Sequence, residues 1–420
     1  MNTAFMKKST ADLVVIGGGA AGMMAAGTAA QTARGRRILL LEHGAKTGSK
    51  LLITGKGRCN VTNDCSVPDI LQNVPRNPRF LQSALYGFPP SEVMEFFQGL
   101  GVKLKTERGN RVFPVSDQAS EIVAALRGWV QDLGVTVQYA EATGLAVGED
   151  ALQGVKTGDG ILIAAKAVIL ATGGCSYPGT GSDGSGYRLA EQAGHTIVPV
   201  EGSLVPLQEA GDWCARLQGL SLRNVGIRLL DKQGKAVYTD FGELLFTHFG
   251  LSGPTVLSAS AHMKTGERYS LSIDLKPALD EQTLDRRLLR EFDSQKNKNL
   301  ENVLTSLYPR KLIPVMLARS GIPGDTKVNA ITKTQRRTLL ELTKSFFVEL
   351  AGKRPVEEAI VTSGGVDVRQ VDPKTMASKR CAGLYFAGEI LDVDAYTGGF
   401  NLQIAWATGR AAGRAAASMI

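Results

Sequence analysis

Residues 13–42 read LVVIGGGAAGMMAAGTAAQTARGRRILLLE, and their pattern predicts the fold of the N-terminal part of the chain. The apolar run at residues 13–16 stops at a glycine, which is typical of a buried strand in a parallel sheet. Small residues at 20–33 predict a helix, and residues 37–42 predict the next strand. Together the three elements take about 30 residues, the length of a strand–helix–strand unit.

Four glycines lie at the turn between that strand and that helix, in a G-x-G-x-x-G pattern. Gly17 makes the turn tight, Gly19 lets a pyrophosphate approach the backbone, and Gly22 lets helix and strand pack closely. Glu42 ends the second strand 20 residues after Gly22, where a carboxylate accepts hydrogen bonds from an adenosine ribose. Because a carboxylate there disfavours a 2′-phosphate, the pattern predicts bound FAD or NAD rather than NADP. A glycine turn with no ligand is the alternative.

The composition is that of a globular protein with more than one domain. The chain has 420 residues, of which 43% are hydrophobic and 21% charged, and this excludes the disordered, collagen-like and coiled-coil classes. Glycine is in excess, at 48 residues, or about 11% against a usual ~7%. Clustered glycine indicates a backbone brought close to a ligand, which in an α/β protein is usually a nucleotide.

The cysteines and the first apolar stretch bear on where the protein works. Five cysteines without a C-x-x-C pair, together with four histidines, predict neither a disulfide framework nor a metal site, and we expect a reducing, cytoplasmic location. Residues 13–30 form an uncharged stretch of the kind found in signal peptides and membrane spans, but Gly17, Gly18, Gly19 and Gly22 interrupt it. A buried strand followed by a glycine turn explains the same residues, so we expect no membrane partner.

Hydrophobic periodicity divides the rest of the chain into an α/β part, a β-rich part and a charged helical part. Residues 50–63 are expected to form a polar glycine loop with little regular structure. The other expected elements are helices at 91–100, 120–133 and 401–420, strands at 135–139, 167–171 and 383–387, alternating β structure over 198–275 and mostly helices over 276–350.

Positive charge is concentrated in the helical part. The chain has 48 Lys and Arg against 40 Asp and Glu, and residues 276–345 alone have 14 against 8. This balance favours anionic partners such as phosphates, carboxylates or nucleic acid, although a solvated helical face accounts for most of the charges. The segment has few aromatic side chains for base stacking, Phe292 and Tyr308, which argues against a nucleic-acid partner.

Two further glycine clusters follow predicted strands. Residues 179–184 repeat the G-x-G-x-x-G pattern, but no acid-ended strand follows at the required distance, so we interpret them as a loop that lines the first nucleotide site. Gly398 and Gly399 open the last helix, whose N-terminus could stabilise negative charge on a flavin. Ordinary helix capping is the alternative for this last cluster.

These motifs resemble the bacterial FAD-dependent oxidoreductases that include aminoacetone oxidase and a flavoprotein proposed to act in bile-acid dehydroxylation, within the glutathione-reductase-like flavoproteins. Ala395 and Phe400 stand where the family pattern leads us to expect glycine and tyrosine. Five blocks in the same order carry the resemblance: VIGGGAAG at 15–22, GKGRCNVTN at 55–63, ATGGCSYPGTGSDGSGY at 171–187, GELLFTHFGLSGP at 242–254 and GLYFAGEILDVDAYTGGFNLQIAWATG at 383–409.

The resemblance implies an α/β fold in which a Rossmann-like FAD-binding domain of glutathione-reductase type is interrupted twice. That domain takes residues 1–195 plus 355–420, a β-barrel-like insertion takes 196–275, and a basic helical insertion takes 276–354. The cofactor implied is non-covalent FAD.

The resemblance also implies which residues surround the cofactor. Residues of the first glycine turn would meet the pyrophosphate, Glu42 the adenosine ribose, and the backbone of Thr143 the adenine. The implied set is Gly17, Gly19, Ala20, Ala21, Gly22, Glu42, Lys50, Arg58, Cys59, Asn60, Thr62, Thr143, Gly173, Gly388, Glu389, Asp392, Gly399, Phe400, Asn401 and Gln403.

The sequence contains fewer candidate residues for the reaction itself than for cofactor binding. His248 lies in one of the family blocks and is a candidate proton donor or acceptor beside flavin N5, while a histidine that hydrogen-bonds barrel backbone is the alternative. Tyr177, Tyr396 and Arg58 are candidates for orienting a substrate carbonyl or carboxylate. Cys59 has the wrong spacing from its nearest neighbouring cysteine for a redox pair, so we expect a packed thiol.

The sequence therefore predicts an FAD-dependent oxidoreductase with a small-molecule substrate. NAD(P)H or an organic substrate would reduce FAD, and the hydride would then pass to an activated double bond or to oxygen. No separate nicotinamide domain is evident, so NAD(P)H would use the substrate face. Two alternatives stay open: a flavoprotein that modifies tRNA or another nucleic acid, and a flavin-binding sensor without turnover.

Overall fold

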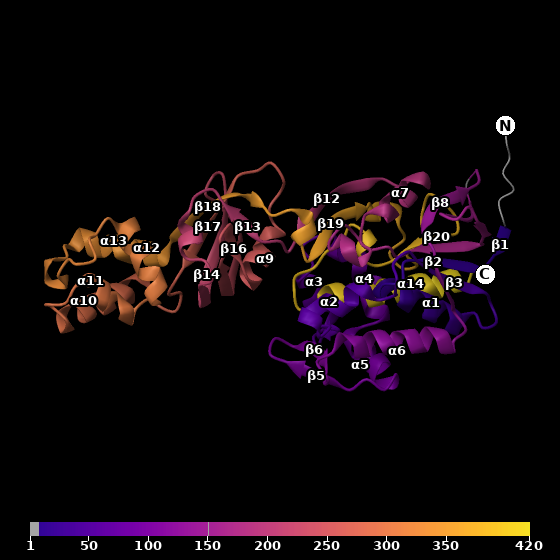
Figure 1. Ribbon diagram of the computed structural model, residues 1–420, viewed down its shortest axis with the longest axis horizontal. Coiled ribbons are helices and arrows are strands. Elements are labelled where there is room, and N and C mark those ends of the chain that lie inside the picture. Colours follow the sequence, from indigo (N-terminus) through magenta and orange to yellow (C-terminus); the bar gives the residue numbers. More distant parts are fainter. Residues whose placement is uncertain (1–7, 150) are drawn as a thin grey trace. The chain divides into compact units, whose positions relative to one another are not determined.

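The computed structural model describes residues 8–149 and 151–420, so the first seven residues of the expected FAD-binding segment lie outside it. The chain separates into two units, which we describe one at a time (Figure 1). Unit 1 consists of Met1–Gly202 and Val356–Ile420, and unit 2 is Ser203–Pro355. Unit 1 is thus built from both ends of the chain.

Unit 1 is organised around a five-stranded parallel sheet with strand order β20-β11-β2-β3-β7. Strand β2 is buried along its whole length, as the apolar run predicts. The chain leaves β2 towards β3 on one side and returns to β11 on the other. The strands are β2 (Leu13–Ile16), β3 (Ile38–Glu42), β7 (Thr136–Tyr139), β11 (Ala167–Leu170) and β20 (Leu384–Phe386).

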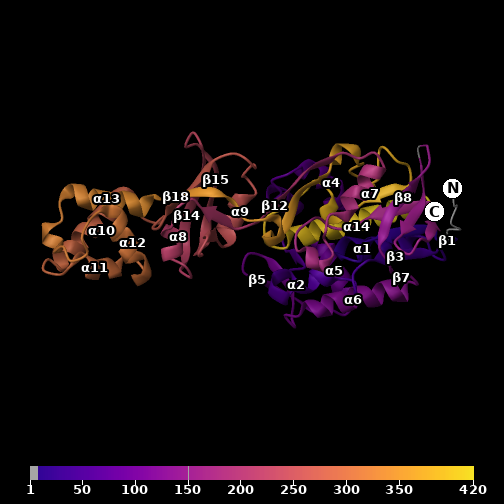
Figure 2. The ribbon, with the colours of Figure 1, turned by 45° about the horizontal axis from the view of Figure 1, so that its top comes forward.

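Two helices from opposite ends of the chain, α1 (Ala20–Thr32) and α14 (Phe400–Ala417), lie side by side against this sheet (Figure 2). Glycine makes the close approach possible. A Cβ atom at Gly413 would lie 2.3 Å from the carbonyl oxygen of Ala25, and one at Gly409 would lie 2.5 Å from that of Ala21. The N-terminal and C-terminal parts of the chain therefore form a single core.

Shorter elements complete unit 1. The second sheet has the order β1-β10-β9-β8, a third has β4-β6-β5, and β12 pairs with β19. These strands are β1 (Lys8–Thr10), β4 (Thr62–Asn63), β5 (Leu104–Glu107), β6 (Arg111–Pro114), β8 (Ala142–Val147), β9 (Leu152–Thr157), β10 (Leu162–Ala164), β12 (Ile197–Ser203) and β19 (Val361–Val366), and the helices are α2 (Ser49–Gly57), α3 (Val67–Gln72), α4 (Pro78–Gly87), α5 (Pro90–Gly99), α6 (Ala119–Asp132) and α7 (Ser185–Gln192).

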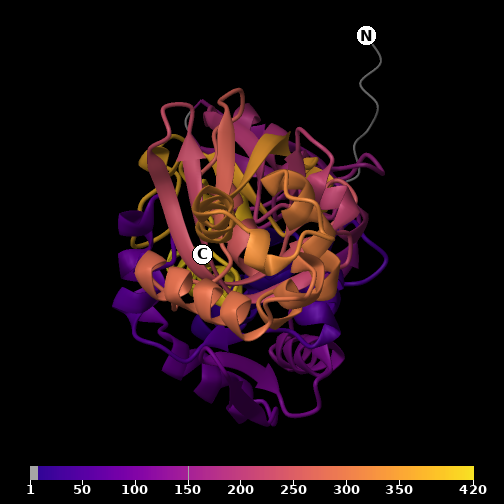
Figure 3. The ribbon, with the colours of Figure 1, turned by 90° about the vertical axis from the view of Figure 1, so that its left-hand side faces the viewer.

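Unit 2 is a closed six-stranded barrel with its own buried core. A group of helices lies at one end of the barrel, and Figure 3 shows these helices in front. The strand order is β13-β16-β15-β14-β17-β18. The strands are β13 (Leu207–Glu209), β14 (Ser221–Asp231), β15 (Ala236–Phe246), β16 (Gly250–Ser252), β17 (Tyr269–Asp274) and β18 (Phe346–Lys353), and the helices are α8 (Trp213–Arg216), α9 (Pro254–Ser260), α10 (Glu281–Ser294), α11 (Leu300–Val303), α12 (Ile313–Ser320) and α13 (Lys333–Lys344). The expected α/β fold with a barrel insertion is confirmed.

Two local expectations are wrong. Residues 50–63, expected as a loop, contain most of α2, which Gly55 (φ +57°) and Lys56 (φ +60°) interrupt near its end, and the short strand β4. Residues 346–350, expected as helix, begin strand β18, whose side chains alternate between buried and exposed with the period of two that a strand requires. Because β18 pairs with β13 and β17, it belongs to the barrel, and helices α10 to α13 form an insertion between the barrel strands β17 and β18.

Three absences hold for the part of the chain that the structure describes. All five cysteines are free thiols. The described residues contain no group of three His, Cys, Asp or Glu side chains suited to a metal ion. Among the helices of residues 8–149 and 151–420, none has both the length and the apolar character needed to cross a membrane.

Candidate functional site

The loops that follow the parallel strands of unit 1 meet at one edge of its sheet. β2, β3, β11 and β20 run parallel, so their carboxyl ends share that edge. The glycine turn at 17–19, the loop at 171–174 and the loop at 387–389 therefore lie together. In open α/β sheets, ligands bind at this edge, where the chain leaves neighbouring strands in opposite directions.

The glycines of the first turn have different structural roles. Gly17 has φ +104°, and a Cβ there would lie 2.5 Å from the carbonyl oxygen of Ala171. At Gly22 a Cβ would lie 1.8 Å from the carbonyl oxygen of Gly17. Gly19, the N-cap of α1, faces open space, with no atom within 4 Å of its Cβ position and no side-chain cap on the helix. The turn thus presents a bare helix N-terminus, which suits a phosphate anion.

Glu42 is held at the end of β3 by the same turn. Its side chain is buried, one carboxylate oxygen accepts from the backbone N–H of Gly18 at 2.9 Å, and the other accepts from Gly44 at 2.6 Å. A carboxylate offers more acceptor positions than these two bonds use. A Cβ at Gly181 would lie 3.2 Å from the His43 ring, so the second glycine cluster, 179–184, lies beside this carboxylate.

An ion pair links α2 to the loop after β20. Lys50 Nζ donates to Glu389 at 2.6 Å and to Ser176 Oγ at 2.7 Å, and the Thr362 backbone N–H also donates to Glu389, at 2.8 Å. Burial disfavours ionised Glu389, but the Lys50 ammonium and these hydrogen bonds outweigh it and hold the pKa of Glu389 below its ordinary value. Glu389 therefore stays ionised, and its ion pair with Lys50 holds both side chains at the strand edge.

Asp392 is fixed by residues that precede α4. Asn77 Nδ2 donates to the backbone carbonyl of Asp392 at 2.7 Å and to its carboxylate at 3.0 Å, and the Arg76 guanidinium pairs with the same carboxylate. Burial raises the pKa of Asp392, although Arg76 and Asn77 act in the opposite direction. The Asp392 carboxylate thus lies buried beside a cation in the segment that follows β20.

The N-terminus of α14 is joined to β4 by internal hydrogen bonds. A Cβ at Gly399 (φ +100°) would lie 2.4 Å from the carbonyl oxygen of Thr62, so only glycine allows this approach. Thr62 Oγ1 donates to Gln403 at 2.6 Å, and Asn401 donates to the Ala395 carbonyl at 2.7 Å and accepts from its N–H at 2.9 Å. The side chains of Thr62, Asn401 and Gln403 therefore shape this end of the helix.

Arg58 and Cys59 do not offer free reactive groups. The Arg58 guanidinium donates to Glu107 at 2.9 Å and to Asp117 at 3.2 Å, and it stacks 4.0 Å from the ring centre of Phe113. Cys59 is fully buried, and burial raises the pKa of its thiol to about 12. Cys59 is therefore a thiol rather than a nucleophilic thiolate at neutral pH.

The other expected cofactor residues lie in loops at the strand edge, at the start of α14 and on β8. Gly173 (φ +76°) and Gly388 (φ +77°) are in the loops after β11 and β20, and a Cβ at Gly388 would lie 2.7 Å from that of Ala21. Phe400 is buried at the start of α14. Thr143 lies on β8, after a segment in which Ala140 N–H donates to the Glu42 carbonyl at 2.9 Å.

Three buried polar atoms near this edge fit a polar ligand. Asn60 Oδ1, Thr172 Oγ1 and the Tyr187 hydroxyl have no hydrogen-bond partner among the residues that the structure describes. Buried polar groups are nearly always paired, so unpaired ones need an explanation. Thr172 follows β11, and Asn60 Oδ1 would lie 3.0 Å from a Cβ at Gly399. These residues fit FAD, whose hydroxyl, amide and phosphate groups could pair with such atoms.

Several residues of this network escaped sequence reasoning. Ser176, Thr362, Arg76 and Asn77 complete the partners of Glu389 and Asp392. Ser176 lies inside a family block, so the resemblance contained a signal for it. The other three lie outside the blocks, and their role depends on contacts between distant parts of the chain.

The residues considered for the reaction fall in both units. Tyr177 (φ +53°) is exposed next to Ser176 in unit 1. His248 is exposed at the turn between β15 and β16 in unit 2, where its ring packs edge-on against Phe249 with centres 5.0 Å apart. In the described residues His248 has no hydrogen bond or ion pair, so nothing ties its imidazole to barrel backbone.

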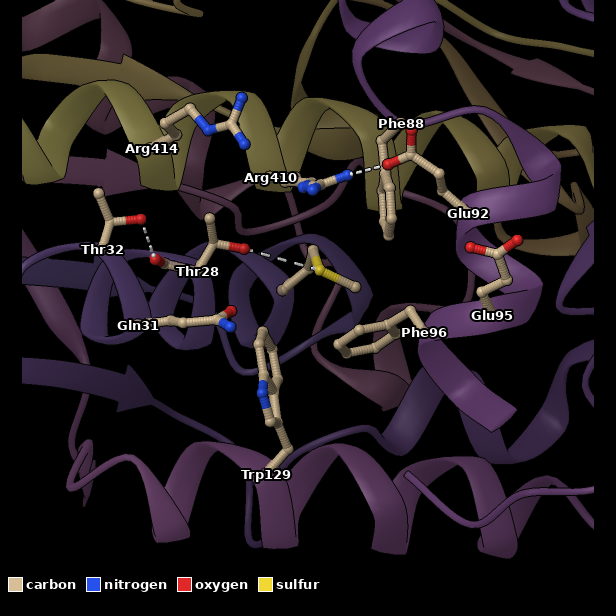
Figure 4. A pocket seen from close by; sticks show the side chains of 11 residues that line it. Thr28, Gln31, Thr32, Phe88, Glu92, Glu95, Phe96, Trp129, Arg410 and Arg414 are labelled. Carbon is tan, nitrogen blue, oxygen red and sulfur yellow. Dashed lines mark hydrogen bonds and ion pairs between the residues drawn. The ribbon is translucent and has the colours of Figure 1, made fainter. Parts of the chain in front are cut away.

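A separate cavity of ≈ 640 Å³ opens along the C-terminal half of α1 (Figure 4). Phe88, Phe96 and Trp129 line it with Arg410, whose guanidinium lies 4.3 Å from the centre of the Phe88 ring and donates to Glu92 at 2.6 Å. The glycine turn lies at the other, N-terminal end of α1. This cavity is therefore distinct from the strand-edge site.

Comparison with known proteins identifies relatives over nearly the whole chain. A family model described as the HI0933-like protein Rossmann domain matches residues 11–415. The 3-dehydro-bile acid delta(4,6)-reductase of Clostridium scindens is 34% identical over 407 residues, covering 96% of this chain and 98% of its own. The ribosomal RNA dihydrouridine synthases of Escherichia coli and Haemophilus influenzae are 33% and 30% identical, each over 94% of this chain and 96% of their own.

Solved structures share the fold at low sequence identity. A quinol fumarate reductase of E. coli superposes with a TM-score of 0.52 at 16% identity, over 99% of this chain and 71% of that one. The 3-ketosteroid-Δ4-(5α)-dehydrogenase of Rhodococcus jostii gives 0.50 at 15% identity, over 99% of this chain and 98% of that one.

Proposed function

The chain belongs to the HI0933-like Rossmann family and is an FAD-dependent oxidoreductase, and on that premise we propose that it reduces a carbon–carbon double bond conjugated with a carbonyl group. The observation that carries the proposal is the full-length similarity to a bile-acid reductase, in a chain whose parallel strands end at a glycine turn that suits a dinucleotide. The acceptor we propose first is a small conjugated ketone.

The named reactions of the relatives support this choice of bond. A delta(4,6)-reductase of a 3-dehydro bile acid saturates double bonds conjugated with a ketone. A dihydrouridine synthase saturates the ring double bond of uracil, which is also conjugated with a carbonyl. Hydride reduction of such a conjugated bond adds the hydride to the carbon remote from the carbonyl and a proton to the carbon next to it. One flavin chemistry would therefore serve either substrate.

We propose that the strand edge of unit 1 holds FAD non-covalently. The N-terminus of α1 would face the pyrophosphate, Glu42 would accept from the adenosine ribose hydroxyls, and the N-terminus of α14 would stabilise negative charge on the flavin. When bound, FAD supplies the hydride transfer. The cradle we propose is the set expected from the sequence, extended by the structure to Thr172 and Tyr187.

We propose His248 as the residue that moves the proton. Its exposed imidazole is free of hydrogen bonds in the described residues, and histidine exchanges protons near neutral pH. His248→Gln should lower kcat and leave FAD content unchanged, and steady-state assays with flavin quantification measure both. Unchanged kcat would assign the proton to another group, for which Tyr177 is the next candidate.

The reductant we propose is NAD(P)H. The test is anaerobic mixing of the purified yellow protein with NADH and then with NADPH, followed through the visible flavin band. Rapid bleaching by one of them, followed by reoxidation with a conjugated ketone, is the expected result. A flavin that neither nucleotide bleaches would overturn this choice and point to an organic electron donor.

A second candidate acceptor is a uridine in ribosomal RNA. Two relatives carry that activity in their names, and unit 2 has 23 Lys and Arg against 16 Asp and Glu. Against it, Phe292 and Tyr308 are buried and offer no stacking surface. Incubation of reduced protein with ribosomal RNA and with a conjugated 3-oxo steroid decides between them, since only the true acceptor should reoxidise the flavin at a catalytic rate.

A further inference from the structure

The cavity along the C-terminal half of α1 has the size of a small-molecule site. Its volume of ≈ 640 Å³ lies in the usual range for ligand pockets, about 300–1,000 Å³. Side chains of α1, α5, α6 and α14 surround it, together with Phe88 at the end of α4, and all of these belong to unit 1 (Figure 4). The walls of the cavity are therefore helices of one unit.

Aromatic side chains form an apolar middle section of this cavity. The rings of Phe96 and Trp129 meet edge to face with centres 4.8 Å apart, and those of Phe96 and Phe88 with centres 6.2 Å apart. Trp129 lies directly on α1, because a Cβ at Gly27 would come within 2.2 Å of its ring. Phe96 and Trp129 are only partly buried. They therefore offer the cavity an apolar surface on which a flat ring can pack.

The charged side chains of the cavity are two acids and two bases, Glu92, Glu95, Arg410 and Arg414. Arg410 and Glu92 pair with each other, because the Arg410 guanidinium donates to the Glu92 carboxylate at 2.6 Å. The side chains of Arg414 and Glu95 are exposed and make no hydrogen bond or ion pair with any residue that the structure describes. One positive and one negative charge are thus left without a partner.

The two unengaged charges lie at opposite ends of the cavity. Figure 4 shows Arg410 between Arg414 and Glu92, with Glu95 on the far side from Arg414. Arg414 follows Arg410 by about one turn of α14, and Glu95 follows Glu92 by about one turn of α5. The cavity therefore has a positive end, an aromatic middle and a negative end.

We propose that this cavity binds a small molecule with a flat apolar body, a carboxylate at one end and an ammonium group at the other. The carboxylate accepts hydrogen bonds from Arg414, the ammonium pairs with Glu95, and the body packs against the aromatic rings. A ligand with only one of these charges would leave Arg414 or Glu95 without a partner. The glycine turn lies at the other end of α1, so the proposal does not depend on the flavin reaction.

The probe is para-(aminomethyl)benzoate, which carries a carboxylate and an ammonium on opposite sides of a benzene ring. It is titrated into the full-length, flavin-loaded protein by calorimetry, and the Tm is measured in parallel. The matched control ligands are para-methylbenzoate and benzylamine, each of which keeps one of the two charges. We expect para-(aminomethyl)benzoate to raise the Tm and to bind at least about threefold more tightly than either control, the gain expected from one solvent-exposed ion pair.

Two variants test how the ligand is oriented. Arg414→Gln should weaken the binding of para-(aminomethyl)benzoate and para-methylbenzoate about threefold, and it should not weaken that of benzylamine. Glu95→Gln should weaken the binding of para-(aminomethyl)benzoate and benzylamine by a similar factor, and it should not weaken that of para-methylbenzoate. Arg188→Gln is the matched control for all three ligands, because Arg188 is an exposed arginine of α7 that does not line the cavity.

Three results would overturn the proposal. The first is no heat and no rise in Tm when para-(aminomethyl)benzoate is added to the wild type. The second is an equal affinity of Arg414→Gln, Glu95→Gln and Arg188→Gln for this probe, since the probe would then bind elsewhere. The third is a loss of affinity in only one of the two cavity variants, which would contradict a ligand held by both charges.

The control ligands keep the test decisive if a variant folds poorly. On the wild type alone, para-(aminomethyl)benzoate must bind more tightly than para-methylbenzoate and benzylamine, and equal affinity of the three would overturn the proposal. Flavin content and flavin bleaching by NAD(P)H are measured on the same samples. Failure of this site and failure of the flavin proposal are therefore separate outcomes.

Discussion

Unit 1 and unit 2 use different means to hold their chains together. Unit 1 has 37 of the 48 glycines and a net charge of only +1, whereas unit 2 has 11 glycines and a net charge of +7. In unit 1, glycine lets backbones come within contact distance at the strand edge and between α1 and α14. In unit 2, a closed barrel pairs its strands without a free edge, and ion pairs such as Arg336–Asp285 join its helices.

The buried atoms left unpaired differ in the same way. In unit 1, Asn60, Thr172 and Tyr187 present uncharged polar atoms near the strand edge. In unit 2, the corresponding atom belongs to a guanidinium, that of Arg287. The first group suits a large ligand with many polar groups, because its atoms lie at the strand edge where the glycine turn leaves open space. Unit 1 thus gathers uncharged polar atoms at one edge of its sheet, whereas unit 2 leaves a single buried guanidinium N–H unpaired among the described residues.

The largest expected effect comes from filling a glycine contact in unit 1. Gly22→Val would drive a side chain into the backbone carbonyl of Gly17, so we expect a loss of more than about 3 kcal/mol in unfolding free energy, the upper end of usual overpacking costs. Denaturant unfolding measures it. Gly128→Val on α6, where a Cβ meets no atom within 4 Å, is the control. Equal stability of the two variants would contradict the close-approach account.

We also expect a loss of folding stability at acidic pH that arises from a buried histidine of unit 1. His195 is buried, accepts or donates one hydrogen bond to Ser378 at 2.7 Å, and has a pKa that burial lowers from 6.5 to about 4. Because the unfolded chain takes up the proton first, this group makes no difference above pH 6.5 and costs up to about 3 kcal/mol of stability as the pH falls towards 4. His195→Gln should flatten the dependence of Tm on pH over that range.

The control for that experiment is an exposed histidine of unit 2. His248→Gln removes an imidazole that is exposed and makes no hydrogen bond or ion pair with the described residues, so the difference between the two variants isolates the contribution of the buried His195 ring. A pH profile unchanged in His195→Gln would show that another group carries the acid sensitivity.

A smaller effect should separate ligand binding from folding in unit 1. Gly19→Val places a side chain in open space at the N-cap of α1, where φ is −81°, so the fold should persist. The side chain would block the approach of a pyrophosphate, and we expect about tenfold weaker FAD binding, equivalent to about 1.4 kcal/mol. Flavin content by absorbance and affinity by fluorescence quenching are the measurements. Full flavin content with unaltered affinity would show that the pyrophosphate does not bind at this turn.

The smallest effect tests whether unit 2 is independent of the flavin. Arg336→Met removes the partly buried pair with Asp285 between α10 and α13, and we expect a loss of about 1 kcal/mol in unfolding free energy with no change in flavin content. Arg337→Met, which breaks an exposed pair with Glu341, should have no measurable effect. A fall in flavin content in Arg336→Met would contradict the separation of the two units.

Hydrophobic periodicity and glycine placement predicted the elements whose structure depends on neighbouring residues in the sequence. The strand before Gly17, the helix after Gly19 and the strand ending at Glu42 follow from hydrophobicity and glycine placement over 30 residues, and each lies where expected. The strand over 346–353 was missed, since its charged surroundings read as helix and its pairing partners, β13 and β17, lie far away in sequence.

For the site, local sequence was enough to predict the glycine turn and its carboxylate, because a single strand–helix–strand unit brings Gly18 and Glu42 together. The partners that come from distant segments depend on the tertiary arrangement of the unit. They are Ser176 and Lys50 on Glu389, Asn77 on Asp392, and Glu107 and Asp117 on Arg58. Sequence periodicity specifies which face of an element is buried. Which element packs against that face depends on the three-dimensional arrangement of the whole unit. A local sequence pattern therefore cannot predict these packing partners.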